Sequence, residues 1–350
     1  MKKVLIKNGR LVNEGKTWEA DIFVEDGRIK KIDQYLSQRD SDTEVIEAHG
    51  LLVLPGLIDD QVHFREPGLT NKADIRSESR AAVAGGITSY IEQPNTVPQT
   101  VTRDEWLAKN ARAATDSLAN YAFNFGATND NLEEIKAISP QEVPGVKVFM
   151  GSSTGNMLVD DERALRGIFE HAPVPVITHC EDEATIQKNL ADFKAKYGDD
   201  IPMVYHPDIR SREACLASSQ LAVSLANEYG TKLHIYHIST AEECELFSNE
   251  QELEDKQITA EACIHHLWFN RDQYEEKGSF IKWNPAVKDE ADRLAIWEAV
   301  KDGRIDVLAT DHAPHTLAEK QNPYTSAPSG GPLVQHALPA LMEFVRDEEI

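Results

Sequence analysis

Cysteine is scarce in this chain of 350 residues. The four cysteines are scattered and form no C-x-x-C pair; they are Cys180, Cys215, Cys244 and Cys263. Such spacing argues against a disulfide framework and against a structural zinc knuckle. A reducing cytoplasm is therefore the expected setting.

Long apolar runs and basic residues are also few. No run of about 18 apolar residues occurs, so we expect no transmembrane helix. The basic start, residues 1–7, has no long apolar segment behind it and is expected to be a first strand rather than a signal peptide. With 36 basic against 59 acidic residues, the formal net charge is -23. This charge argues against nucleic acid or an anionic membrane as partner, and an anionic substrate would need a local positive site.

Two patterns divide the chain. Residues 1–53 contain short apolar runs separated by turn pairs such as Asn8-Gly9 and Asp26-Gly27, which predicts a small β-domain. In residues 54–350, short β-branched runs alternate with helical stretches, the clearest at 103–119, 160–171, 213–229 and 289–302. Eight strands are expected at 57–62, 87–93, 121–126, 145–150, 174–179, 232–237, 258–264 and 305–310. Eight such units predict a (β/α)8 TIM barrel, with a doubly wound sheet as the alternative. Residues 317–332 are expected to form a long loop.

Polar side chains alternate along the first expected barrel strand. Asp59, Gln61, His63 and Arg65 share one face, because side chains alternate with a period of two along a strand. Burying an acid, an amide, an imidazole and a guanidinium without partners is costly. The row therefore indicates a functional site at the strand's carboxyl end, and an exposed strand end is the alternative.

Lys147 lies within an apolar run of the fourth expected strand. Burial drives a lysine toward its neutral amine. A neutral amine can react with carbon dioxide to form a carbamate, an anionic ligand that can bridge two metal ions. A lysine that reaches solvent from an edge is an equal alternative on sequence alone.

Histidines end two later strands. His179 ends the fifth, and His234 and His237 lie at the end of the sixth. His234 and His237 are three residues apart, so only one can point squarely inward, and His237 is the better candidate. A lone histidine at a strand end is more often structural, but three with His63 indicate a metal site, because neutral imidazole is a usual zinc ligand.

The eighth strand runs into Asp311, whose carboxylate could hold a metal and accept a proton from metal-bound water. His315, farther along this loop, could reach a substrate, whereas His312 is expected to be structural. Asn95 follows the second strand and Asn284 the seventh. Both could form hydrogen bonds with an amide ring, although Asn and Pro pairs are also common in turns.

Adjacent histidines at positions 265 and 266 could suggest another metal site. Adjacent residues of a strand point to opposite faces, so His265 and His266 cannot together chelate one inward metal ion. We expect them to be structural or to lie behind the ligands.

Taken together, these motifs resemble dihydroorotase of the amidohydrolase superfamily. The matching runs are 55–59, 63–68 (HFREPG), 81–88 (AAVAGGIT), 94–96 and 311–316 (DHAPHT), and the resemblance extends to about residue 340. This combination of motifs distinguishes dihydroorotases from their near relatives. Hydantoinases lack the arginine two residues after the metal-binding histidine, and allantoinases usually lack counterparts of Arg65 and Asn95-Thr96 in this form.

The resemblance implies a role for each matching residue. Two zinc ions would be bound by His63, a bridging carbamylated Lys147, His179, His237 and Asp311. The substrate carboxylate would be bound by Arg65, Asn95 and His315, and the pyrimidine ring would lie beside Asn284.

The implied reaction is the reversible, metal-dependent cyclisation of N-carbamoyl-L-aspartate to (S)-dihydroorotate in de novo pyrimidine biosynthesis. A bridging hydroxide would be the nucleophile in the hydrolytic direction. Asp311 would act as general acid and base.

One ligand position departs from the family pattern. Dihydroorotases usually have histidine where this chain has Gln61. Glutamine is a neutral oxygen donor and a poor zinc ligand, so Gln61 is a doubtful ligand. Our hypothesis is that the metal site shared with His63 and Asp311 is weakened, and two tightly held zinc ions per chain would contradict it.

Two other functions remain open on sequence alone. One is a cyclic amidase of the hydantoinase or allantoinase type, and the other is an inactive dihydroorotase-like scaffold that supports a partner such as aspartate transcarbamoylase. Retention of the other ligands favours an active enzyme, expected to be a homodimer. Family members usually continue past the eighth helix, in which this chain ends. We therefore expect the C-terminal part of a β-sandwich to be missing and its exposed strand edge to promote association.

Overall fold

The computed structural model describes residues 2–37, 40–151 and 157–347. It divides into two compact units, residues 1–57 and 58–350. The expectation that the chain ends inside its last helix concerns residues 348–350, which lie outside the described residues.

The smaller unit is a sheet of five strands: β1 (Lys3–Asn13), β2 (Lys16–Glu25), β3 (Arg28–Asp33), β4 (Thr43–Glu47) and β5 (Leu52–Val53). The order is β3-β2-β1-β4, with β5 also paired to β1. Its core contains Leu11, Ala20 and Ile22. The expected turn at Asn8-Gly9 is wrong: both residues lie within β1, where the pairing with β2 shifts register between Ile6 and Gly9. Asn8 has a φ of 59° there, so the residue pair marks a bulge rather than a chain reversal.

Parallel strands form the centre of the larger unit. Their bounds are β6 (Leu57–Val62), β7 (Ile87–Glu92), β8 (Asn120–Phe123), β9 (Phe125–Gly126), β10 (Val146–Phe149), β11 (Val176–His179), β12 (Leu233–Ile235), β13 (Ile258–Cys263) and β14 (Val307–Ala309). They pair in the orders β6-β7-β8 and β9-β10-β11-β12-β13-β14. Each lies within or beside an expected strand, and Asn124 separates β8 from β9 in the third. A parallel bridge between Val62 and His312 connects the two ends of this series.

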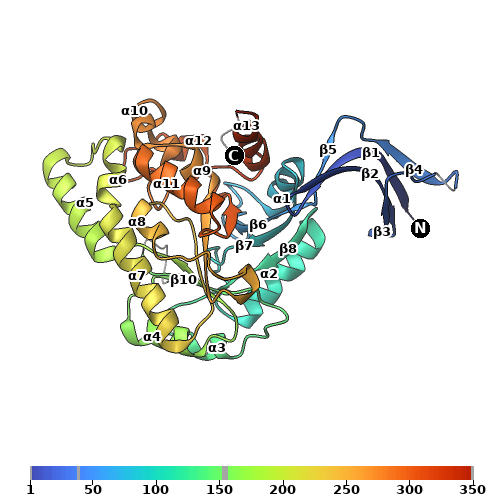
Figure 1. Ribbon diagram of the computed structural model, residues 1–350. Coiled ribbons are helices and arrows are strands. Elements are labelled where there is room, and N and C mark those ends of the chain that lie inside the picture. Colours follow the sequence, from blue (N-terminus) through green and yellow to red (C-terminus); the bar gives the residue numbers. More distant parts are fainter. Residues whose placement is uncertain (1, 38–39, 152–156, 348–350) are drawn as a thin grey trace. The chain divides into compact units, whose positions relative to one another are not determined.

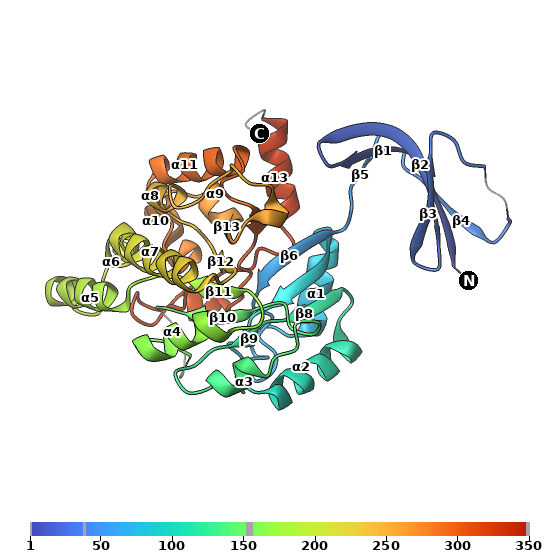
Figure 2. The same cartoon turned by 60° about the horizontal axis from the view of Figure 1, so that its bottom comes forward.

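Helices follow most of these strands and lie around them (Figures 1 and 2). Their bounds are α1 (Ile75–Ala84), α2 (Arg103–Asp116), α3 (Leu132–Lys136), α4 (Glu162–His171), α5 (Glu183–Tyr197), α6 (His206–Ile209), α7 (Arg212–Tyr229), α8 (Ala241–Cys244), α9 (Ile264–Trp268), α10 (Tyr274–Lys277), α11 (Glu290–Lys301), α12 (Leu317–Lys320) and α13 (Ala337–Arg346). Side-chain caps explain several starts: Thr102 accepts a hydrogen bond from the backbone of Glu105, and Asp161 from that of Ala164. Among the described residues, no helix has the length and apolar character needed to cross a membrane.

The four clearest helix predictions are confirmed by α2, α4, α7 and α11. The expected loop over residues 317–332 is partly wrong, because α12 occupies its start. Thr316 and Glu319 form a capping box there, a local signal that the Pro and Gly content of the segment obscured. His265 and His266 also lie in a helix, α9, rather than at a strand end.

Candidate active site

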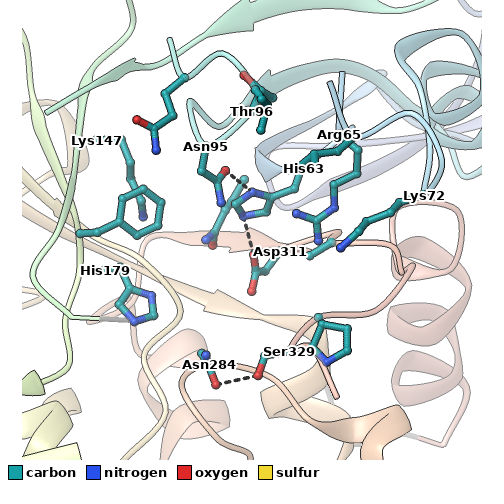
Figure 3. Close-up of a pocket in the computed structure, with 18 of the residues that line it drawn as sticks. His63, Arg65, Lys72, Asn95, Thr96, Lys147, His179, Asn284, Asp311 and Ser329 are labelled. Atoms are coloured by element: carbon teal, nitrogen blue, oxygen red, sulfur yellow. Dashed lines mark hydrogen bonds and ion pairs between the residues drawn. The ribbon is translucent and has the colours of Figure 1, made fainter. Parts of the chain in front are cut away.

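A cavity of about 800 Å³ lies at the carboxyl ends of the parallel strands. All ten predicted site residues line it: Gln61, His63, Arg65, Asn95, Lys147, His179, His237, Asn284, Asp311 and His315. They come from segments far apart in sequence, most of them at or just after a strand's end. Figure 3 shows Lys147 and His179 on one side of the cavity, Arg65 and Lys72 on another, and His63 with Asp311 between them.

We call Lys147, His179 and His237 the ligand side of the cavity. Lys147 in β10 is 0% exposed, so the structure does not place it at a solvent edge. Its Nζ lies 4.0 Å from the ring centre of Tyr236 and has no hydrogen-bond partner among the described residues. Burial lowers the pKa of Lys147 to about 8, because a charged ammonium is costly away from water.

A buried carboxylate orients His179, which in turn contacts His237. His179 Nε2 lies 2.8 Å from Glu181 Oε2, and its Nδ1 lies 2.9 Å from His237 Nε2. Burial raises the pKa of Glu181, but the Arg210 charge and the His179 contact outweigh it and bring this pKa to about 2. Glu181 is therefore a carboxylate that accepts a hydrogen bond from His179 Nε2–H, which leaves the Nδ1 lone pair facing His237. A carboxylate behind a histidine is the usual support of a metal-binding imidazole.

The third histidine is held in a similar way. His63 Nδ1 lies 2.8 Å from Asn95 Oδ1, an acceptor, so Nδ1 carries the proton of the neutral ring. His63 Nε2 then presents a lone pair to Asp311 Oδ1, 3.2 Å away. Burial lowers the pKa of His63, which favours the neutral imidazole. Two acceptors thus face each other, an arrangement that a shared cation would stabilise.

Of the expected row of inward side chains, Gln61 lines the cavity and Asp59 does not. Asp59 does not line the cavity; its Oδ2 accepts a hydrogen bond from Thr310 Oγ1 at 2.5 Å. Gln61 lines the cavity, and its Oε1 accepts a contact from Cys263 Sγ at 3.7 Å. The prediction that Asp59 belongs to the site is therefore wrong. Thr310, at the end of a neighbouring strand, binds the Asp59 carboxylate outside the cavity.

We call Arg65, Lys72 and His315 the cation side of the cavity. His315 Nδ1 accepts a hydrogen bond from Lys72 Nζ at 3.1 Å, and its Nε2 lies 2.9 Å from the carbonyl of Ser329 and 3.0 Å from Arg65 Nη2. Burial, followed by the charges of Arg65 and Lys72, lowers the pKa of His315 to about 3. His315 is therefore neutral at physiological pH, and the positive charge of this side resides on Arg65 and Lys72.

Sequence reasoning missed several of the residues that build the site. Lys72 lies in a segment without a pattern, and Ser329, whose Oγ donates to Asn284 Oδ1 at 2.9 Å, is one of several small polar residues in its loop. Glu181 follows directly after His179-Cys180, and a carboxylate so close to a predicted ligand histidine is a signal that could have been used. Its partner Arg210 is distant in sequence and had no such signal.

Three site residues have backbone angles that L-residues rarely adopt. The φ angles of Arg65, His237 and Asp311 are 67°, 42° and 46°. A positive φ is costly for a residue with a Cβ atom and clusters at functional sites. Here it occurs where the chain leaves β6, β12 and β14, and thus turns three polar side chains toward the cavity.

The remaining histidines are placed outside the cavity. His234 Nδ1 lies 2.7 Å from Thr259 Oγ1, as the preference for His237 implied. His312 binds Glu78 through Nε2 at 2.6 Å, which agrees with a structural role. His265 stacks on Trp283 with ring centres 4.4 Å apart, and His266 Nε2 contacts the carbonyl of Pro285 at 3.2 Å.

The donor set fits zinc. Burial lowers the pKa of His63, His179 and His237, so all three imidazoles are neutral, as metal binding requires. Asp311 adds a carboxylate, and Lys147 adds a buried amine that makes no hydrogen bond to any described residue. Such mixed nitrogen and oxygen donors are those of catalytic zinc sites.

Comparison with known proteins gives one consistent result. The amidohydrolase family model matches residues 52–340. Dihydroorotase of Methanosarcina mazei is 36% identical, over 99% of this chain and 76% of its own length, and that of Staphylococcus epidermidis is 32% identical, over 98% and 80%. Among solved structures, L-hydantoinase (dihydropyrimidinase) from Arthrobacter aurescens superposes with a TM-score of 0.92 at 29% identity, over 99% of this chain and 78% of that one.

The chain belongs to the amidohydrolase family and is a cyclic amide hydrolase. Within that family it groups with the dihydroorotases, so the relation predicted from the motifs is confirmed.

Proposed function

We propose that this chain interconverts N-carbamoyl-L-aspartate and (S)-dihydroorotate. The observation that carries the proposal is the opposition of the ligand side and the cation side within one cavity. The substrate has the same division, with an amide at one end and a carboxylate at the other. The amide carbonyl would face Lys147, His179 and His237, and the carboxylate would face Arg65.

The metal ligands in this proposal are His63, Lys147 as a carbamate, His179, His237 and Asp311, with Gln61 a doubtful sixth. Two zinc ions bound there would lower the pKa of a water molecule and polarise the amide carbonyl. Carbamylation is supported by the burial of Lys147 and by its Nζ, which has no hydrogen-bond partner among the described residues and needs only its neutral form to react.

Asp311 is the proposed proton carrier. Its carboxylate lies beside His63 at the edge between the two sides of the cavity. In hydrolysis, Asp311 accepts the proton that the attacking water loses and delivers it to the ring nitrogen as the carbon–nitrogen bond breaks. In cyclisation, Asp311 accepts the proton from the attacking carbamoyl nitrogen and gives it to the departing oxygen.

The other residues position the substrate. The guanidinium of Arg65, held by a hydrogen bond from Nε to the carbonyl of Pro314 at 3.1 Å, suits a carboxylate. His315 is neutral, and its Nε2–H, which now faces the carbonyl of Ser329, would turn to the substrate carboxylate. Asn284, held by Ser329, would bond to the polar edge of the ring.

We propose further that the parallel strands form a closed (β/α)8 barrel, supported by the bridge from Val62 to His312. The second layer of the small β-domain stays a prediction. A homodimer and an aspartate transcarbamoylase partner rest on the family resemblance, and a cytoplasmic location rests on the few, scattered cysteines.

The test is hydrolysis of dihydroorotate by purified chain, first stripped with a chelator and then supplied with zinc in bicarbonate buffer. We expect turnover that requires zinc and that prefers dihydroorotate over dihydrouracil, which lacks the carboxylate. Arg65→Gln should lower kcat/KM for dihydroorotate about 100-fold, since truncating one partner of a buried charged pair costs about 2–5 kcal/mol. Arg76→Gln, an exposed arginine of α1, is the control and should change little.

The two rival functions give different results. A hydantoinase would hydrolyse dihydrouracil at least as well as dihydroorotate and would tolerate Arg65→Gln. A scaffold would remain folded and bind zinc without turning over either compound.

A further inference from the structure

Three acidic and imidazole side chains meet below the active-site cavity. Asp60 of β6, His234 of β12 and Glu261 of β13 each offer a ligand atom within 4.8 Å of the others. All three are described residues, and none of them lines the cavity. Asp60 and His234 each precede a cavity histidine, His63 and His237, by three residues. At about 3.3 Å per strand residue, the group lies a layer nearer the amino ends of the strands.

Each of the three residues has one possible metal-ligand atom that makes no hydrogen bond to the described residues. Glu261 is 0% exposed; its Oε1 accepts from the backbone N–H of His237 at 3.0 Å, and its Oε2 has no partner in the described chain. Asp60 Oδ1 and His234 Nε2 likewise lack a hydrogen-bond partner there. His234 Nε2 does lie 3.2 Å from Asp60 Oδ2, close enough for an ion pair.

The tautomer of His234 is determined by its neighbour. The hydroxyl of Thr259 donates to the carbonyl of Leu233 at 3.4 Å, so its oxygen accepts from His234 Nδ1–H at 2.7 Å. In the neutral ring the Nε2 lone pair then faces the carboxylates. Three acceptors therefore converge in a buried space and need a shared proton or a cation between them.

A divalent ion meets this requirement better than a shared proton. Two carboxylates this close repel each other, and one proton neutralises only one of them. Without a carbamate, Lys147 would bring a positive charge near Glu261, but its Nζ makes no hydrogen bond to any of the three described side chains. One imidazole nitrogen with two carboxylate oxygens is a donor set of zinc and related transition metals.

Solvent reaches the edge of the group but not its three unpartnered ligand atoms. The side chain of Asp60 is 19% exposed and that of His234 12% exposed, although Glu261 is fully buried. An ion could therefore enter from the Asp60 and His234 side and be held by Glu261 behind them.

We propose that Asp60, His234 and Glu261 form a further divalent metal site of the zinc type, separate from the ligands of the cavity. It goes beyond the proposed activity and does not depend on it. An ion there would link β6, β12 and β13, which are distant in sequence, and would act as a structural tie beneath the catalytic residues.

The first test is the zinc content of three proteins after reconstitution and removal of loosely bound metal. Glu261→Gln, which keeps the side chain's shape, should bind one equivalent fewer than the unmodified chain. The control is Glu243→Gln, because Glu243 is also buried but its Oε1 accepts a hydrogen bond from Ser219 at 2.7 Å and it lies outside the group. Equal zinc content in Glu261→Gln and the unmodified chain would overturn the proposal and indicate a shared proton instead.

The second test needs no variant and decides the matter if Glu261→Gln does not fold. Crystals of the unmodified, zinc-loaded chain should give an anomalous peak at the zinc edge between Asp60, His234 and Glu261, besides any peak in the cavity. A cavity peak without one between these residues would refute the site. Absence of dihydroorotate turnover with the lower peak present would count against the proposed activity alone.

Discussion

The two sides of the cavity differ in how they carry charge. On the ligand side, burial lowers the pKa of His179 and His237 and thus keeps both imidazoles neutral and able to bind cations. On the cation side, Arg65 and Lys72 bear positive charge, and their presence helps to keep His315 neutral. One side therefore suits metal ions and the other suits an anion. Changes on the ligand side should mainly affect kcat and metal binding, whereas changes on the cation side should mainly affect KM.

The largest expected effect is at Asp311, which lies between the two sides. Asp311→Asn should lower kcat for dihydroorotate hydrolysis about 1,000-fold, since a positioned acid–base group contributes about 10²–10⁴. Steady-state kinetics measure this, with exposed Asp160→Asn as the control. A kcat within tenfold of the unmodified chain would exclude Asp311 as the proton carrier.

Next in size is the carboxylate behind the ligand side. Glu181→Gln removes the charge that holds His179 Nε2–H and should weaken zinc binding about 10–100-fold. Competition with a chromophoric chelator measures the affinity. Glu243→Gln, a buried carboxylate without a histidine partner, should leave it unchanged. Equal affinities in these two variants would mean that Glu181 serves only Arg210.

A substitution at Gln61 tests whether this position limits the affinity of the second zinc site. Gln61→His restores an imidazole where an amide oxygen now lies near Cys263, and should raise the affinity of the weaker zinc site about tenfold or more. The same chelator competition, resolved into two binding steps, provides the comparison. Two zinc-binding steps of equal affinity in the unmodified chain would contradict the proposal that one zinc site is weakened.

Lys147 predicts a pH dependence of carbamate formation. Burial lowers its pKa to about 8, so the reactive neutral fraction increases as the pH rises, about tenfold between pH 7 and pH 9. At fixed dissolved carbon dioxide, the reactivation rate of decarbamylated protein should follow this increase and level off above it. A rate that is independent of pH over this interval would show that the Lys147 amine is not the reacting group.

The smallest expected effect is at Lys72. Its Nζ lies 3.2 Å from Glu319 Oε1, so its charge is already partly offset, and Lys72→Gln should raise KM for dihydroorotate about fivefold with kcat unchanged. The exposed Lys136→Gln is the matched control. A loss of kcat with KM unchanged would mean that Lys72 takes part in the reaction step and not in substrate binding.

Much of this arrangement could be predicted because of how parallel strands end. Short apolar runs ending in His179 or Asp311 indicate both a strand and the edge where its last side chain lies. Carboxyl ends of such strands meet on one face, so residues scattered over the sequence could be assigned to one site before any contact was known. The same reasoning failed for Asp59, because alternation gives a direction but not a partner, and Thr310 provides that partner.

Sequence alone determined the succession of strands along the chain, the residue types at the strand ends and the family, because period-two patterns and motif spacing are local properties of the chain. Tertiary structure decided the rest. Lys72 reaches His315 from 243 residues away, Arg210 reaches Glu181 across 29, and Asp60, His234 and Glu261 meet only where β6, β12 and β13 converge. Burial, which sets the protonation of Lys147 and the histidines, is likewise a property of the packed fold and of no single segment.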